Sequence, residues 1–367
     1  MQPRHFALTF ALLAGCATYE PKPLVPTETA AAFEKRSLES PELRAFMEKQ
    51  LGHELKAWPP HRAPPGWTLP LLTLAAYYYH PSLEVARANW AEAQAAVVTA
   101  GGRPNPTLTL SPGYNFNAAS GVTPWMPGVA FDLPLETMGK RGLRVLRAQQ
   151  SAEAARWQLV GTAWQVRAGV RDALLNFSDA MQRDQLLSAQ YKLQEQFLGR
   201  LQERVDAGAI PRSDLTPARI ALEKLRLEAA ELIRVKGEST VRLAEAVGVP
   251  VASLNRAQGI GLAWHFPDAT HLTTPEARHR ALTHRADIAA ALVEYEASQT
   301  ALRLEIAKQY PDVHLGSGFQ WDQGESKWTF LSFSAELPVL NRNQGPIAEA
   351  QARRAGAAAR VEAAQAK

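Results

Sequence analysis

The side chains that could carry out chemistry in this chain are nine histidines, one cysteine and several pairs of carboxylates. His279 and His284 are five residues apart and do not share a helix face well. The histidines form no cluster with the spacing of a zinc site. Acidic pairs such as Asp172 and Asp179 fit a solvated helix face, and the sequence lacks a nucleophile elbow, a P-loop and a dinucleotide fingerprint. We therefore expect no enzyme, no metal site and no cofactor.

The single cysteine, Cys16, follows a short apolar segment with a weakly basic start. This pattern indicates a secretory signal peptide over residues 1–15, which is not part of the fold. Leu13-Ala14-Gly15-Cys16 resembles a bacterial lipoprotein box, and the resemblance implies cleavage before Cys16 and acylation of its thiol. Ala17 then points to the outer membrane, since an Asp in that place favours inner-membrane retention in such lipoproteins. The alternative is a plain signal peptide with an incidental cysteine.

The overall composition is that of an ordinary folded protein, with 46% hydrophobic and 21% charged residues among 367. The net charge of +4 is small. Basic residues are spread out and form no tract with interleaved aromatic residues, so we expect no nucleic-acid partner. No stretch of about 18 apolar residues occurs, so we expect no transmembrane helix in the mature chain.

One long stretch, Arg141 to Ala207, is made of strong helix formers and contains no proline. Its apolar residues recur every three or four positions, which predicts a single helix roughly 100 Å long. Gly208 and Pro211 should end it, and Ser213 or Asp214 should cap a second helix over 215–247. A helix of this length needs other long helices to bury its apolar stripe, so the sequence predicts an elongated helical hairpin.

The remaining chain contains alternating segments and an internal repeat. Apolar and polar residues alternate in hairpins over 107–133 and 312–337, which predicts four strands. An offset of 205 residues superimposes the second helix–hairpin unit on the first, as Pro311 falls on Pro106. We expect this order of segments: 1–15 signal peptide, 16–70 extended lipid-anchored tether with one helix at about 41–51, 71–283 first repeat, and 284–367 incomplete second repeat.

The strands are about eleven residues long, a length that suits tilted membrane strands. A soluble sheet packed on helices is the alternative, but an exported chain with helices of this length offers no compact core for it. Four strands cannot close a membrane barrel. We therefore expect copies of the chain to pool their strands, eight from two copies or twelve from three.

As a set, these features resemble the TolC-like outer-membrane efflux proteins. The resemblance covers roughly Leu69 to Lys367 and rests on the duplication, the Pro106 and Pro311 strand starts, the tip Gly208-Ala209-Ile210-Pro211-Arg212-Ser213-Asp214-Leu215 and the ending Leu243-Ala244-Glu245-Ala246-Val247-Gly248. It implies a mostly α fold with β-hairpins, a homotrimer, a twelve-stranded β-barrel in outer-membrane lipid, and a periplasmic tunnel of helices. Asn105-Pro106 and the segment 136–144 resemble the branch that serves heavy-metal efflux pumps.

The resemblance also implies partners and a site. An inner-membrane pump would supply the energy, and a periplasmic adaptor protein would dock at the hairpin tip, through Gly208, Ile210, Pro211, Arg212, Ser213 and Asp214. The second repeat stops about 23 residues into its long helix. We expect either a truncated product or a partner that supplies the rest. The function expected is a passive exit duct for small solutes or metal ions. The alternatives are a non-conducting periplasmic lipoprotein scaffold and a duct for type I protein secretion.

Overall fold

The computed structural model describes residues 17–55, 58, 60, 66–257, 259–261 and 274–367. The expected signal peptide and lipid anchor at Cys16 lie outside the described residues. The helices are α2 (Pro26–Glu34), α3 (Pro41–Leu51), α4 (Leu69–Tyr79), α5 (Pro81–Gly101), α6 (Lys140–Asp206), η2 (Arg212–Asp214), α7 (Leu215–Val247), α8 (Val251–Arg256), α9 (Pro275–His284), α10 (Ala286–Ala307) and α11 (Gln344–Gln365). The strands are β1 (Thr107–Tyr114), β2 (Trp125–Leu135), β3 (Val313–Asp322) and β4 (Glu325–Ala335).

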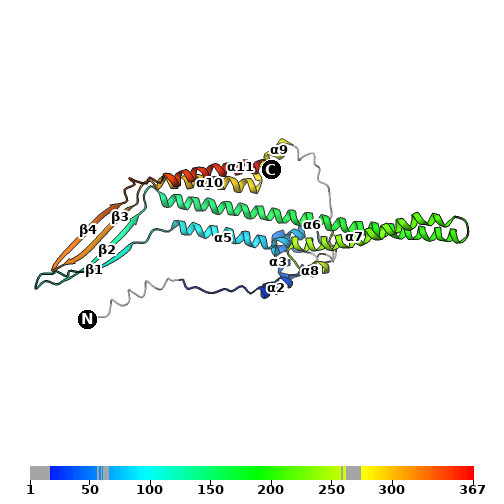
Figure 1. The fold of residues 1–367 in the computed structure, drawn as a ribbon, viewed down its shortest axis with the longest axis horizontal. Helices are drawn as coiled ribbons and strands as arrows, with labels where there is room; N and C mark the ends of the chain where they lie inside the picture. The colour runs from blue at the N-terminus through cyan, green and yellow to red at the C-terminus, as the bar shows by residue number, and fades with distance from the viewer. Residues whose placement is uncertain (1–16, 56–57, 59, 61–65, 258, 262–273) are drawn as a thin grey trace.

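The predicted long helix is confirmed as α6, a single helix of 67 residues displaced by one residue from the expected bounds. It begins after Gly139, whose φ is 66°, a left-handed conformation that glycine adopts without steric cost. The second helix, α7, has the expected bounds, and Gly248 ends it with φ 82° while its amide donates to Ala244 O at 2.9 Å. Figure 1 shows the α6–α7 hairpin tip and the sheet at opposite ends of an elongated molecule.

The proline-rich tether contains more helix than the sequence analysis predicts. The helix α3 is confirmed, and Ser40 Oγ caps it by accepting a bond from the amide of Leu43 at 3.1 Å. A second helix, α2, occupies residues expected to be extended. The reason is that Pro26 stands in its first turn, where the fixed φ of proline suits a helix and its missing N–H costs nothing.

The four strands form one antiparallel sheet in the order β1-β2-β3-β4. The two hairpins are confirmed, although β1 has only 8 residues and is shorter than the expected length of about eleven. The start of β4 follows from a two-residue turn at Gln323 and Gly324, both with positive φ.

The helices next to the sheet follow the same order as the strands. α5 packs on α6, α6 on α10, and α10 on α11. Figure 1 shows that α5 is connected to β1, α6 to β2, α10 to β3 and α11 to β4. The protein is therefore a wall with two flanks, α5/β1 and α11/β4. Its main apolar core lies near the middle, where α3, α4, α6, α7 and α8 meet around Leu72, Val170, Leu174 and Leu243.

Candidate functional site

The hairpin tip is an exposed turn built by backbone bonds. Gly208 has φ 71°, and its amide donates to Val205 O at 2.9 Å while the amide of Ala209 donates to Arg204 O at 2.8 Å. These two bonds satisfy carbonyls at the end of α6, as a glycine stop does. Leu215, only 1% exposed, anchors the return helix against α6. The tip thus presents a fixed backbone shape at the far end of the molecule.

The expected tip residues are brought together, but their expected capping role is wrong in part. Pro211 directly precedes the single turn η2, and no side chain caps either η2 or α7. Ser213 Oγ instead donates to Asp214 Oδ1 at 3.3 Å. The amide of Asp214 donates to Pro211 O at 3.1 Å. This backbone bond of the turn, and not a side-chain cap, satisfies an amide at the start of the return helix. Arg212, Ser213 and Asp214 are exposed, and their side chains face solvent at this end.

The sheet has one polar face and one apolar face. The register places the following polar and small residues on one face: Thr107, Thr109, Ser111, Asp132, His314, Gln320, Ser332 and Ser334. The other face carries Leu108, Leu110, Phe131, Leu133, Leu315, Phe319 and Phe333. Leu110 is 70% and Phe333 68% exposed. An exposed apolar face of this kind needs an apolar environment.

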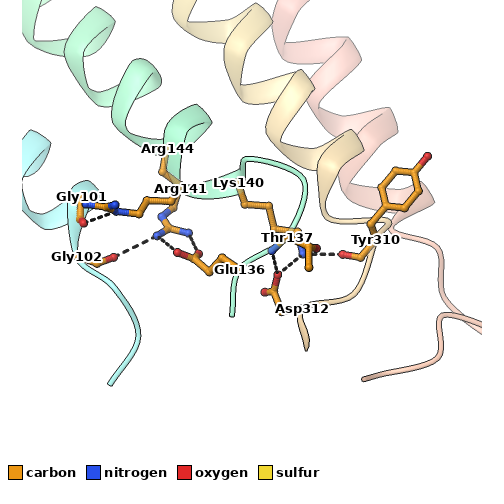
Figure 2. A network of polar contacts seen from close by, with 9 residues as sticks. All are labelled: Gly101, Gly102, Glu136, Thr137, Lys140, Arg141, Arg144, Tyr310 and Asp312. Carbon is orange, nitrogen blue, oxygen red and sulfur yellow. Dashed lines mark hydrogen bonds and ion pairs between the residues drawn. The ribbon is translucent and has the colours of Figure 1, made fainter. Parts of the chain in front are cut away.

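A charged joint connects the two repeats where strands become helices (Figure 2). Lys140 Nζ donates to Tyr310 O at 2.6 Å and to Asp312 Oδ1 at 2.8 Å. The amide of Thr137 donates to the same carboxylate oxygen at 2.9 Å, and Thr137 Oγ1 donates to Pro311 O at 2.7 Å. The start of α6 therefore holds the segment that leads into β3.

The same helix start is fixed to the first repeat as well. Arg141 Nε donates to Gly101 O at 2.7 Å, and Arg144 pairs with Glu136 and donates to Gly102 O at 3.3 Å. Figure 2 shows these contacts side by side with the Lys140 contacts. Residues 136–144 do not reveal this joint in the sequence, because most of its acceptors are backbone carbonyls, which have no sequence signature.

The electrostatics of the joint favour an ionised Asp312. Partial burial raises the pKa of Asp312, but the bonds from Lys140 Nζ and the Thr137 amide outweigh burial and place the pKa below its usual range. Lys140 has a side chain only 9% exposed, while that of Asp312 is 36% exposed. The pair is thus a partly buried ion pair in which Asp312 Oδ1 accepts from both Lys140 Nζ and the Thr137 amide.

A second set of contacts fixes the N-terminal segment to the middle of the molecule. Arg36 Nη1 donates to Tyr79 O at 2.8 Å and to Gly248 O at 2.9 Å, which are carbonyls at the C-terminal ends of α4 and α7. The guanidinium also lies 5.2 Å from the Phe33 ring and 5.7 Å from the Tyr79 ring. A cation in this place satisfies unpaired carbonyls and complements two helix dipoles. The expected tether is therefore a docked part of the fold.

Two general observations limit the chemistry of the part that the structure describes. It contains no group of three or more His, Cys, Asp or Glu side chains placed to hold a metal ion. Among its helices, none is both long and apolar enough to cross a membrane.

Known proteins share this arrangement. VceC, an outer membrane protein of Vibrio cholerae, superimposes with a TM-score of 0.66 at 20% identity, over 81% of this chain and 75% of VceC. The open state of the MtrE outer membrane channel of Neisseria gonorrhoeae gives 0.60 at 17% identity, over 81% and 69%. This chain therefore shares the fold of these outer membrane proteins.

Comparison of the sequence, unlike comparison of the fold, gives matches to a protein family and to a curated protein. Residues 76–249 match the model of the outer membrane efflux protein family. The cobalt-zinc-cadmium resistance protein CzcC of Cupriavidus metallidurans is 26% identical over 217 residues, 59% of this chain and 51% of CzcC. The chain spans about half the length of this curated relative.

Proposed function

We propose that the protein is the outer-membrane channel component of an efflux system and acts as a passive duct. The observation that carries the proposal is the wall of four helices and four strands with an exposed apolar sheet face and a polar opposite face. Three copies would bring twelve strands together, with the apolar face toward lipid and the polar face toward water. The domain match over residues 76–249 supports the same role.

The partners proposed are those of a three-part export system. Acylated Cys16 would hold the chain at the outer membrane, and the long α6–α7 hairpin would reach into the periplasm. An adaptor protein would dock at Gly208, Ile210, Pro211, Arg212, Ser213 and Asp214, and an inner-membrane pump would drive export. An exposed turn of fixed backbone shape at the end of the hairpin suits such docking.

The proposed cargo is divalent transition-metal cations. This rests on the likeness to CzcC, whose name refers to resistance to cobalt, zinc and cadmium. The pump would select the cation, and the duct would let the selected cation pass.

Two measurements test the proposal. Purified protein should give discrete ion conductance in planar bilayers. On a denaturing gel, the unheated protein should migrate as a trimer that heating converts to the monomer. Cells lacking the gene should accumulate more cobalt, zinc or cadmium than cells that carry it. A monomer without conductance would overturn the duct and favour the scaffold. Conductance with unchanged metal content would overturn the cargo alone.

A further inference from the structure

The polar face of the sheet contains a close pair of side chains that can bind metals. His314 Nδ1 of β3 lies 2.8 Å from Asp132 Oδ2 of β2, and each of the two side chains is 41% exposed. The register places Gly316 between Asp132 on β2 and Ser332 on β4. A Cβ at position 316 would collide with Ser332 Oγ, so this hydroxyl leans over the glycine. An imidazole, a carboxylate and a hydroxyl thus gather on one face around a glycine.

The strand is irregular where this pair lies, and the fold does not require the imidazole. The register between β3 and β4 shifts between Gly316 and Gly318. Such bulges re-aim side chains and are frequent next to functional sites. The offset of 205 that relates the two repeats places Thr109 of β1 at the position of His314. The same place in the repeated hairpin therefore accepts a small hydroxyl side chain.

A hollow of about 390 Å³ adjoins His314 at the end of the sheet that meets the helices. Glu336 lines the hollow and is exposed. The lysine and arginine side chains that line it are each paired with a carboxylate, in Lys140–Asp312, Arg144–Glu136 and Lys308–Glu305. Because these pairs cancel, the carboxylate of Glu336 makes the hollow net negative, which raises the local concentration of cations.

The donor atoms of the pair suit a divalent transition metal. Zinc and cobalt accept imidazole nitrogen and carboxylate oxygen, and bonds of about 2.0–2.2 Å separate two neighbouring ligand atoms by about 2.9–3.5 Å. The present 2.8 Å between His314 and Asp132 therefore needs only a small rotation of either side chain. Among the described residues, no third His, Cys, Asp or Glu is placed to complete the set, so water supplies the other ligands. Two protein ligands suit brief binding, because cargo in a channel must bind weakly enough to leave.

We infer that Asp132 and His314 form a transit site, at which a divalent transition-metal cation binds briefly as it moves along the polar face of the sheet. The inference deepens the proposed function and rests on it for the cargo. In the hydrogen-bonded pair, Nδ1 of the neutral ring donates its proton to the carboxylate. The cation takes the place of that proton, and the ring then carries its one proton on Nε2.

Modification of histidine tests the site without requiring transport. Diethyl pyrocarbonate attacks a ring nitrogen that has a free lone pair, which in the hydrogen-bonded His314 is Nε2. A cation on Nδ1 leaves the proton on Nε2 and removes that lone pair. In the purified protein in detergent, Zn²⁺ should protect His314 in peptide mass spectrometry, whereas Mg²⁺ should not, because it prefers oxygen ligands and keeps its waters. His284, exposed on α9 next to Arg285, is the internal control and should react equally in every sample.

A variant of the carboxylate tests whether both ligands are needed. Asp132→Asn keeps the shape and an acceptor oxygen for the ring but removes the charge. The Zn²⁺ concentration that half protects His314 should rise by about tenfold or more. Asp322→Asn, at the other end of β3 where Asp322 pairs with Lys327, is the matched control and should leave that concentration unchanged. No protection in the parent, or equal protection in Asp132→Asn, would overturn the site and leave a structural pair.

Current through planar bilayers tests the transit role. Zn²⁺ should reduce the current of the parent at the concentrations that protect His314, and His314→Gln should need about tenfold more. His284→Gln is the matched control and should keep the block of the parent. Equal block in His314→Gln would overturn the transit role. Conductance without protection would overturn the site and leave the duct, whereas protection without conductance would overturn the duct and leave the cation site.

Discussion

Lys140 and Asp312, which are 172 residues apart, form an ion pair of 2.8 Å between the start of α6 and the segment that enters β3. The same carboxylate oxygen accepts the Thr137 amide at 2.9 Å. The pair links the strand-to-helix turn of one repeat to the helix-to-strand turn of the other. The joint therefore ties the start of α6 to the residues that lead into β3.

Replacing Lys140 should weaken this joint. In Lys140→Met the Asp312 carboxylate loses its cation and keeps only the bond from the Thr137 amide, so we expect the free energy of unfolding to fall by about 1–3 kcal/mol. Thermal unfolding followed by circular dichroism in detergent measures this. Arg353→Met, at an exposed pair on α11, is the control and should change stability by less than about 0.5 kcal/mol. Adding Asp312→Asn should recover part of the loss; an additive loss would show that the two side chains are not coupled.

The joint illustrates what the sequence could and could not predict. The long helix follows from an unbroken run of helix formers, and its end follows from Gly208 and Pro211, because these features act locally. Lys140 and Arg36 were missed because they bind backbone carbonyls far away in the chain. The helix α2 lies within the segment expected to be extended, because a proline such as Pro26 is compatible both with extended chain and with the first turn of a helix.

The stability of the helix α5 should depend on pH, because His80 caps its N-terminus. The ring Nδ1 accepts the amide of Ser82 at 3.3 Å and lies 2.7 Å from Ser82 Oγ, so the neutral ring caps the helix. Burial lowers the pKa of His80, and the charge of Glu245 opposes this in part. A folded pKa below the usual value of about 6.5 means that the stabilisation is present above that pH and is lost as the pH falls through the folded pKa.

The measurement is the free energy of unfolding between pH 8 and pH 5. We expect a loss of roughly 0.5–1 kcal/mol from this cap over that range. His80→Asn keeps a capping acceptor that does not titrate, so the variant should lose that part of the pH dependence. An identical pH profile in the variant and the parent would exclude His80 as its source.

Arg36 should be required to hold the N-terminal segment against the middle of the molecule. Arg36→Ala removes two bonds to carbonyls at the ends of α4 and α7, and we expect a loss of about 2–3 kcal/mol. Arg36→Lys keeps the charge but not the planar fork, so it should recover only part. Limited proteolysis should cut between α2 and α3 faster in the alanine variant. Equal cutting in parent and variant would mean that other contacts suffice.

Substitutions at the tip should separate the shape of the turn from its surface. Gly208 has φ 71° with open space around the position of a Cβ, so Gly208→Ala strains only the backbone, by about 1 kcal/mol. Arg212→Ala with Asp214→Ala leaves the turn intact, because its bonds come from the backbone. We expect the double variant to keep its thermal stability and its oligomer, and to lose most crosslinking to the adaptor from a photoreactive residue at position 209.

The control for the tip experiment is Arg204→Ala with Glu203→Ala, which removes the same charges one turn away on α6 and should leave crosslinking unchanged. If the Arg212 and Asp214 variant crosslinks as the parent does while Gly208→Ala does not, the adaptor recognises the backbone shape of the turn. Docking through the two charged side chains would then be wrong. If instead the Arg212 and Asp214 variant loses crosslinking while Gly208→Ala keeps it, the adaptor recognises the exposed charges, because the double variant and the parent have the same turn.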